Sequence, residues 1–264
     1  MKAFSNFHTH SLYCDGKNSP EEMVLEAISL GCEAIGFSGH SNTPFDPGYC
    51  MDETREKAYC REILRLREAY GDRIRIYLGI EQDYYSAPAD PVYSYRIGSV
   101  HYVKKNGRYL SIDDTPEILY EGVQALYGGD FYSLCEDYYS LVSDVVQKTG
   151  CQIVGHFDLI TKFNEKHHFF EESHPRYLAA AEGALRALLR QGALLEINTG
   201  AMSRGWMTRP YPGPALLKIL GKQRAKMILS SDAHRKQDLL YGLPQAAALA
   251  KQYGILLAED PFQR

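Results

Sequence analysis

Short apolar runs alternate along this chain with longer stretches in which apolar residues recur at helical spacing. Runs of this length, rich in Val, Ile, Leu and Phe, are typical of strands buried in a parallel sheet. The sequence predicts seven such strands, at residues 3–8, 34–39, 73–81, 96–102, 151–156, 193–198 and 227–232. It predicts helices near residues 52–70, 116–127, 130–148, 174–191, 213–221 and 239–253. The connection over 82–94 looks irregular, and the helix pair within 116–148 is an insertion beyond a simple strand-helix unit.

The clearest helix start lies at Ser19-Pro20-Glu21-Glu22. Ser19 can cap the helix, Pro20 suits the first turn, and Glu22 completes a capping box. Gly31 is expected to end this helix. Repeated strand-then-helix units predict a parallel sheet, which at 264 residues forms either a closed barrel or a doubly wound sheet.

Histidines and carboxylates decide between these two folds, because they recur where predicted strands end. They are His8, His10 and Asp15 after the first strand, His40 after the second, Glu81 at the third, His101 at the fourth, His156 at the fifth, and Asp232 and His234 at the seventh. The sixth strand offers no obvious ligand. So many strand ends meet at one point only when the sheet closes, because the C-terminal rim of a barrel gathers them around its axis. We therefore predict an α/β fold, a distorted (β/α)7 TIM-like barrel with a metal site at that rim.

The pair His8 and His10 shows why these residue types indicate metal binding. Alternation along a strand points residues i and i+2 to the same face, so the two imidazoles can share an ion. The full set supplies six imidazoles and three carboxylates, which is enough for three divalent ions if a carboxylate such as Glu81 bridges two of them. Zinc, manganese and iron all accept such a mixture of ligands.

Other candidate ligands are set aside. His167, His168 and His174 lie in a polar stretch that we expect to be a solvated loop, with a lid over a substrate as the alternative. The six cysteines are scattered without a C-x-x-C spacing, so we expect reduced thiols rather than disulfides. Cys14 neighbours Asp15, but every other candidate donor is oxygen or nitrogen, so Cys14 is not counted as a ligand.

Composition narrows the class of protein. The chain lacks a linker, which predicts one domain over residues 1–264. A net charge of −4 and a pI near 6.1 disfavour a nucleic-acid partner but leave room for a small anionic substrate. No apolar run approaches the roughly 20 residues of a membrane-spanning helix. The first residues do not resemble a secretion signal, so we expect a cytoplasmic protein without a membrane partner.

The motifs around these ligands resemble those of the PHP (polymerase and histidinol phosphatase) family. They are H-T-H with Asp15, F-S-G-H-S at His40, G-I-E at Glu81, S-V-H at His101, G-H-F-D at His156, and S-S-D-A-H at Asp232 and His234. In length and in the G-H-F-D segment, the chain is most similar to the stand-alone histidinol-phosphate phosphatases of that family. Those proteins are distorted (β/α)7 barrels with a trinuclear site.

The resemblance implies a division of the ligands among three ions. One ion would be held by His8, His10, Glu81 and Asp232, a second by Glu81, His101 and His156, and a third by Asp15, His40 and His234. Glu81 and Asp232 would hold the metals around a nucleophilic hydroxide. The implied reaction is hydrolysis of L-histidinol phosphate to L-histidinol and inorganic phosphate, a step of histidine biosynthesis. We find neither a G-x-S-x-G elbow nor a phosphate-cradling glycine loop that would suggest another route.

Substrate-binding residues are expected around the same rim. Arg204 is the first choice for the phosphate, because its planar donor fork suits phosphate oxygens; Lys162 is the second and Arg209 the third. Asp83 or Asp158 could pair with a substrate ammonium group. Aromatic rings could pack on an imidazole. The tyrosines expected in rim segments are Tyr84, Tyr85, Tyr93, Tyr95, Tyr102, Tyr127, Tyr132, Tyr138 and Tyr139.

Three other functions remain open from the sequence. The nearest is a PHP-family phosphoesterase acting on nucleotides, other small phosphate esters or nucleic-acid ends, which the ligands alone do not exclude. A metal-dependent amidohydrolase also begins with H-x-H, but no strand-end lysine here matches its bridging ligand. A non-catalytic metal-binding protein is disfavoured by the complete ligand set with open coordination positions. Metal identity and oligomeric state are not determined by these patterns.

Overall fold

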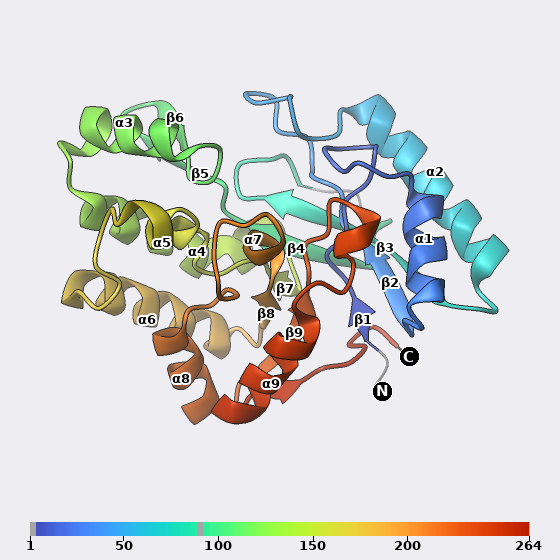
Figure 1. The fold of residues 1–264 in the computed structure, drawn as a ribbon. Helices are drawn as coiled ribbons and strands as arrows, with labels where there is room; N and C mark the ends of the chain where they lie inside the picture. The colour runs from blue at the N-terminus through green and yellow to red at the C-terminus, as the bar shows by residue number, and fades with distance from the viewer. Residues whose placement is uncertain (1–3, 89–91, 264) are drawn as a thin grey trace.

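The computed structural model describes residues 4–88 and 92–263. Its main feature is a sheet in which eight parallel strands curl into a half-barrel with helices on the outer side (Figure 1). In spatial order the strands are β1 (Ser5–Asn6), β2 (Ala34–Phe37), β3 (Arg75–Asp83), β4 (Tyr95–Ser99), β7 (Ile153–Val154), β8 (Leu194–Asn198), β9 (Lys226–Ser230) and β10 (Leu256–Leu257). The prediction of a barrel-like α/β fold is confirmed.

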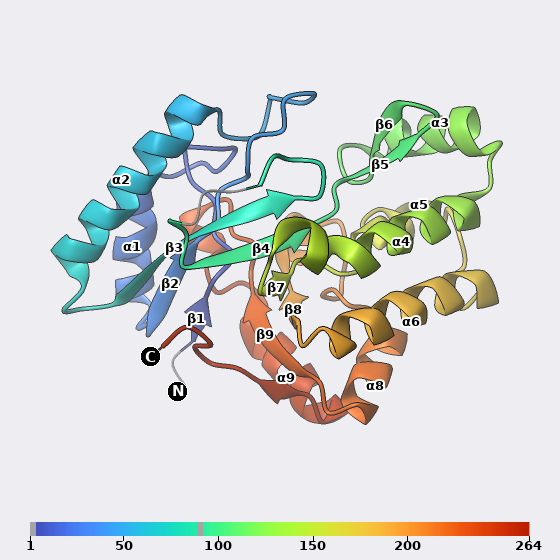
Figure 2. The ribbon, with the colours of Figure 1, turned by 180° about the vertical axis from the view of Figure 1, so that it is seen from behind.

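Helices follow most of the strands, as the repeated units predict. They are α1 (Pro20–Ser29), α2 (Glu53–Tyr70), α3 (Pro116–Tyr127), α4 (Phe131–Thr149), α5 (Asn164–His167), α6 (Pro175–Arg190), α7 (Gly200–Ser203), α8 (Pro214–Lys222) and α9 (Leu243–Tyr253). Short 3-10 turns occur at Leu159–Thr161 and Lys236–Asp238. Seen from behind, α3 and α4 stand apart from α1 and α2 on opposite sides of the molecule (Figure 2). None of these helices is both long enough and apolar enough to cross a bilayer, in the part of the chain that the structure describes.

The segments that follow strands β1 and β9 contact each other and bring the two sides of the half-barrel together. Thr9 and Ala233 form a parallel bridge, in which the His10 amide donates to the Ala233 carbonyl over 2.9 Å. The Ala233 amide in turn donates to the His8 carbonyl over 3.2 Å. This bridge lies at the carboxyl ends of the strands, so it brings the residues after β1 and those after β9 to the same rim.

The opposite end of the half-barrel is closed by aromatic packing. The Tyr95 hydroxyl reaches across the interior to donate to the carbonyls of Phe7 and Phe37, at 2.5 and 3.0 Å. Gly79 makes room for this ring, because a Cβ there would lie 2.3 Å from the Tyr95 ring atoms. Phe262 then stacks on Tyr95 with ring centroids 4.9 Å apart. The C-terminal segment therefore seals the end of the half-barrel away from the predicted metal site.

The capping box at α1 is confirmed. The Ser19 hydroxyl accepts from the Glu22 amide over 3.2 Å, and the Ser19 amide donates to the Glu22 carboxylate over 2.9 Å. The helix ends at Ser29, and Gly31 follows with φ of +70°, a conformation that glycine adopts without steric cost.

Several boundaries differ from the prediction, mainly where the chain leaves the sheet. The expected strand 96–102 is two strands, because β4 ends at Ser99 and an antiparallel hairpin follows, formed by β5 (Tyr102–Lys105) and β6 (Arg108–Ser111). Strand β10 was not predicted, since two leucines are too short a signal. The expected strands 3–8 and 151–156 each form only two residues of ladder. Residue 3 of the first strand and residues 89–91 of the expected irregular connection lie outside the described residues.

Candidate metal centre

All nine residues singled out by the sequence lie together at the carboxyl ends of the strands. Their imidazole nitrogens and carboxylate oxygens form overlapping groups within which the donor atoms lie no more than 4.8 Å from one another. These groups are His10, Asp15, His40 and His234; His8, Glu81 and His156; His8, His10 and Asp232; and His40, Glu81 and His101. The curled sheet thus brings candidate ligands that are far apart in the sequence to one rim, as predicted.

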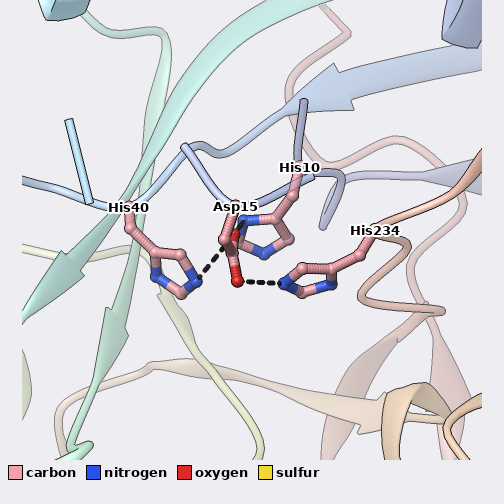
Figure 3. A group of neighbouring side chains, drawn as sticks. All are labelled: His10, Asp15, His40 and His234. Carbon is pink, nitrogen blue, oxygen red and sulfur yellow. Dashed lines mark ion pairs between the residues drawn. The ribbon is translucent and has the colours of Figure 1, made fainter. Parts of the chain in front are cut away.

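The first of these groups is the most exposed of the four (Figure 3). Asp15 comes from the loop after β1 and points between two imidazoles, with Oδ2 at 3.1 Å from His234 Nε2 and Oδ1 at 3.6 Å from His40 Nε2. The His10 ring stacks on His234 with centroids 4.0 Å apart. Asp15 and His234 are only partly buried, whereas His10 is fully buried. An ion bound here would therefore be open to solvent or substrate on one side.

Glu81, at the end of β3, occupies the middle of the centre. Its Oε2 lies 3.2 Å from His8 Nε2 and 3.0 Å from His40 Nδ1. Its Oε1 lies 2.9 Å from His156 Nε2 and 3.4 Å from His101 Nε2. Because the two oxygens of one carboxylate face different imidazoles, Glu81 has the geometry that a bridging ligand requires.

Several buried donor atoms here have no hydrogen-bond partner among the described residues. They are His8 Nε2, His10 Nε2, Asp15 Oδ1 and Glu81 Oε2. A buried polar atom without a hydrogen-bond partner costs free energy. Four such atoms in one site therefore indicate that the site binds a ligand from outside the chain. The mixed nitrogen and oxygen donors fit a divalent first-row metal ion.

The charges of the site favour the ligating forms of Glu81 and His10, whereas at His8, His40 and His101 the neighbouring carboxylates outweigh the effect of burial and raise the imidazole pKa. Burial by itself raises the pKa of Glu81, but the imidazoles of His8, His40 and His101 outweigh it and hold the carboxyl well below its usual range. Burial lowers the pKa of His10 to about 3, and neighbouring imidazoles act in the same direction. His10 is therefore neutral near pH 7 and keeps a lone pair for an ion.

A second set of residues orients the ligands, and the sequence analysis missed its main member. Glu196 of β8 is fully buried, and its Oε1 lies 2.7 Å from His8 Nδ1. A carboxylate only accepts, so the His8 proton sits on Nδ1 and Nε2 is left to face the centre. Asp83 plays the same part for His101, with Oδ2 at 3.2 Å from Nδ1. The sixth strand, expected to add no ligand, thus adds an orienting carboxylate; the charged residue in Leu194-Leu195-Glu196-Ile197 was the available signal.

A cavity of about 340 Å³ opens over the centre. Both leading phosphate candidates line it, as do three carboxylates that were not predicted, Asp46, Asp113 and Asp114. Arg204 donates from Nη2 to Asp232 Oδ2 over 3.0 Å. The Lys162 ammonium donates to the Asp113 carbonyl over 2.6 Å and lies 3.1 Å from its carboxylate. Cations and acids therefore stand on the walls of one pocket.

Arg209, the third phosphate candidate, does not line this cavity. Its guanidinium donates to Glu172 over 2.6 Å and lies 3.5 Å from Glu165. Asp158 and Asp83, suggested as partners for an ammonium group, also lie outside it. Asp158 is fully buried and accepts from the Gly213 amide over 2.8 Å, and burial raises its pKa to about 6. These three side chains bind other parts of the protein rather than facing the pocket.

Only one of the tyrosines expected at the rim, Tyr102, lines the cavity. Its hydroxyl donates to Asp46 over 2.8 Å. Tyr49, which was not predicted, also lines it and packs edge-on against His40 with centroids 4.8 Å apart. Tyr95, Tyr138 and Tyr139 are instead buried in the core. The aromatic wall of the pocket is thus smaller than the sequence suggests.

The remaining histidines and the cysteines behave as ordinary structural residues. His167 and His168 are exposed, while His174 accepts from the Arg176 amide at the start of α6 over 3.2 Å. None of the three lines the cavity, so the lid alternative has no support. All six cysteines are free thiols, as expected. Burial raises the pKa of Cys14 to about 12, which keeps this thiol protonated and disfavours it as a ligand.

A family model for the PHP domain matches residues 6–200, which hold seven of the nine candidate ligands. The chain belongs to the PHP family. A PHP relative from Schizosaccharomyces pombe, named "Probable histidinol-phosphatase", is 29% identical over 256 residues, which cover 86% of this chain and 79% of the relative. A relative from Deinococcus radiodurans, also named "Probable histidinol-phosphatase", is 26% identical over 268 residues, which cover 96% of this chain and 95% of the relative, so the likeness includes the segment after β9 that holds Asp232 and His234.

Solved structures show the same fold. A crystal structure from Listeria monocytogenes is similar with a TM-score of 0.81 at 21% identity, covering 91% of this chain and 99% of that one. The histidinol phosphate phosphatase of Lactococcus lactis, solved with zinc, L-histidinol and phosphate, is similar with a TM-score of 0.70 at 21% identity, covering 96% of this chain and 95% of that one. The half-barrel is therefore a PHP fold along nearly the whole chain.

Proposed function

We propose that this PHP protein is a metal-dependent phosphomonoesterase that hydrolyses L-histidinol phosphate to L-histidinol and inorganic phosphate. The convergence of nine metal-ligating side chains beneath one cavity carries the proposal. The histidinol-phosphatase name of its relative and the histidinol and phosphate bound in the Lactococcus lactis structure support this choice of substrate. The product would belong to histidine biosynthesis, and the expected cytoplasmic location stays a prediction.

The centre would hold three divalent ions, divided as the family resemblance implies. Zinc, manganese and iron all suit the donors, and the zinc in the Lactococcus lactis structure favours that metal. Such ions supply positive charge and water of lowered pKa. Glu81 and Asp232 would be the central ligands, because each lies within 4 Å of several imidazoles. With about six positive charges against three ligating carboxylates, the loaded centre would attract a phosphate dianion.

The cavity lining carries both signs of charge, which suits this substrate. Arg204 and Lys162 would bind the phosphate, since both present cationic donors to the cavity above the ligands. Asp46 and Asp114 would face the cationic part of histidinol, in the place first assigned to Asp83 and Asp158, whereas Asp113 is paired with Lys162. A pocket that offers both cations and carboxylates favours a substrate that carries both charges.

The alternative is another small phosphate ester or a nucleotide as substrate of the same centre. The net charge of −4 disfavours binding to a long phosphate backbone. The carboxylates on the cavity wall also disfavour a purely anionic ester, because it would meet like charges there. Histidinol phosphate, whose organic part is cationic, meets neither objection.

The deciding experiment is phosphate release by the purified protein. After metal analysis and reconstitution with zinc, manganese or iron, L-histidinol phosphate would be compared with sugar phosphates, nucleotides and short oligonucleotides. We expect a kcat/KM preference of at least about 100-fold for histidinol phosphate, equivalent to about 2.7 kcal/mol. A preference for nucleotides or DNA ends would reject the proposed substrate, and no hydrolysis despite bound metal would reject the proposed activity.

Glu81→Gln tests the centre itself. This change removes the central negative charge and one ligand oxygen while keeping the size of the side chain, so we expect kcat to fall by about 10³-fold or more. The metal content per chain should fall as well. Glu121→Gln, an exposed position on α3, is the matched control and should match the wild type in both measurements. Full activity of Glu81→Gln would contradict the proposed role.

A further inference from the structure

Asp232 has a backbone conformation that residues with a side chain seldom adopt. Its φ is +49°, in the left-handed region, which costs free energy even though aspartate tolerates it better than most residues do. The residue is also buried, with 4% relative exposure. A strained residue in a site persists only when its surroundings hold it there, so the contacts of Asp232 identify what does so.

Arg204 makes two hydrogen bonds to this one residue. Its Nη2 donates to Asp232 Oδ2 over 3.0 Å, and its Nη1 donates to the Asp232 carbonyl over 3.2 Å. The guanidinium can make both bonds at once because its donors form a planar, fixed fork. Arg204 therefore holds the carboxylate and the main chain of Asp232 in one arrangement.

The other carboxylate oxygen of Asp232 remains available to an ion. Oδ1 lies 3.3 Å from His10 Nε2 and 3.7 Å from His8 Nε2, on the side of the candidate ligands. Because the two oxygens face different partners, an ion at Oδ1 and the guanidinium at Oδ2 can be bound at the same time. The bond to Arg204 would then fix the direction in which Oδ1 points.

The Asp232 carbonyl also contacts a second candidate ligand, His234, whose Nδ1 lies 3.0 Å away. A carbonyl only accepts, so this contact places the imidazole proton on Nδ1 and leaves Nε2 to face Asp15 at 3.1 Å. Arg204 Nη1 lies 3.2 Å from the same Nδ1, and while that nitrogen carries the proton it bonds the carbonyl alone. Holding the main chain of Asp232 thus also holds a contact of His234.

The fold brings Arg204 to Asp232 from a neighbouring strand. The short helix α7 begins at Gly200, two residues after the end of β8, and Arg204 follows its last residue. The Thr199 amide donates to the Ser230 carbonyl over 3.0 Å, which holds the start of α7 against the end of β9. Gly200 leaves room for the pair, because a Cβ there would lie 2.7 Å from Asp232 Oδ2 and 2.9 Å from Arg204 Nη2.

We propose that Arg204 is a positioning residue for metal binding, which holds Asp232 so that Oδ1 points at the ion. The inference rests on the proposed function, because it takes the metal centre to be loaded. It adds to the phosphate binding proposed for Arg204, whose Nε is a buried donor without a partner in the described chain and stays available to a phosphate oxygen. A guanidinium that only bound phosphate would leave the metal affinity unchanged in the absence of phosphate.

The test is the zinc affinity of Arg204→Lys, measured without phosphate by competition with a chromogenic chelator. Lysine keeps the positive charge but replaces the planar fork with a single ammonium group. We expect zinc to bind about 10-fold more weakly, as when other residues that orient ligands are lost. Arg209→Lys is the matched control, because that guanidinium bonds Glu172 over 2.6 Å away from the cavity. It should bind zinc as the wild type does.

Gly200→Ala tests the same contact while keeping both side chains. The added Cβ would push Asp232 and Arg204 apart, so we expect a similar loss of zinc affinity. Gly183→Ala is the control, since nothing lies within 4 Å of its added Cβ. These two variants decide the question if Arg204→Lys fails to fold. Each titration is made well below the melting temperature of the variant, so that a loss of stability alone leaves the measured affinity unchanged.

Wild-type zinc affinity in both Arg204→Lys and Gly200→Ala would overturn the inference. If Arg204→Lys then bound inorganic phosphate more weakly in its zinc-loaded form, Arg204 would serve the phosphate alone.

The zinc titrations also separate the inference from the proposed function, because they need no phosphate ester. A wild type that binds zinc but cleaves no ester would reject the phosphatase, and the titrations would still decide the role of Arg204. An active wild type whose variants keep full zinc affinity would reject that role and leave the phosphatase standing.

Discussion

At the scale of single residues, the centre depends on carboxylates that contact no candidate ion site directly. Glu196 orients His8, accepts from the His156 amide over 3.0 Å, and accepts from the Asn198 side chain over 3.0 Å. One carboxylate thus sets the tautomer of one ligand and the backbone position of another. Partners of this kind fix the orientation of a ligating imidazole and raise its basicity, so their loss lowers metal affinity.

Glu196→Gln is expected to weaken metal binding while leaving the fold intact. The amide is the same size but carries no charge, so it holds the His8 Nδ1 proton less firmly and makes Nε2 a poorer donor. The loss in metal affinity should be about 10- to 100-fold, measured by competition with a chromogenic chelator. Glu182→Gln, on the outer face of α6 and paired with Arg186, is the control. Equal metal affinity in both variants would refute the orienting role.

At the scale of elements, close packing of side chains inside the half-barrel holds the strand ends in position to form the site. Tyr95 of β4 fills the interior of the half-barrel, and its hydroxyl donates to the carbonyls of Phe37 on β2 and of Phe7 after β1. Gly36 of β2 and Gly79 of β3 lie against its ring. The ring therefore links strands that do not neighbour each other in the sheet. Its packing fixes the curvature that brings the strand ends together.

Gly79→Ala should destabilise the protein, because its Cβ would overlap the Tyr95 ring. Overpacking of this kind costs about 1–3 kcal/mol, measured as the free energy of unfolding in urea. Gly183→Ala, at an exposed position of α6, is the matched control, since nothing lies within 4 Å of its added Cβ. That change should be neutral or stabilising by up to about 1 kcal/mol, because alanine favours a helix over glycine. Similar effects at both positions would show that Tyr95 does not constrain the curl.

At the scale of the whole molecule, the candidate metal centre brings together residues from both sides of the sheet. Its candidate ligands come from β3 and from the segments after β1, β2, β4, β7 and β9. The bridge between Thr9 and Ala233 links the loop after β1 to the loop after β9, and the Lys17 amide donates to the His234 carbonyl over 2.7 Å between the same loops. Ions bound here would add cross-links between the segments that follow β1 and β9.

Removal of the metals should lower the melting temperature of the whole domain. Ligands that bind only the folded state add about 2.7 kcal/mol of stability at a concentration 100 times their dissociation constant. Calorimetric scans of chelator-treated protein, before and after addition of zinc, measure this effect. The same scans on Glu81→Gln should show a much smaller rise on adding zinc. A metal-independent melting temperature in the wild type would argue against cross-linking.

Sequence by itself determined the fold class, the set of candidate ligands and the α1 capping box, because each follows from short local patterns. Donor residues placed where a strand ends remain at the same rim however the outer helices pack, so all nine could be named before the structure. Tertiary structure alone decided the surroundings of Glu196 and Arg209. Their partners lie far away in the chain, as with the 188 residues between His8 and Glu196. The role of a buried charged or hydroxyl group depends on which residues the curled sheet packs against it. No local sequence pattern predicts that contact.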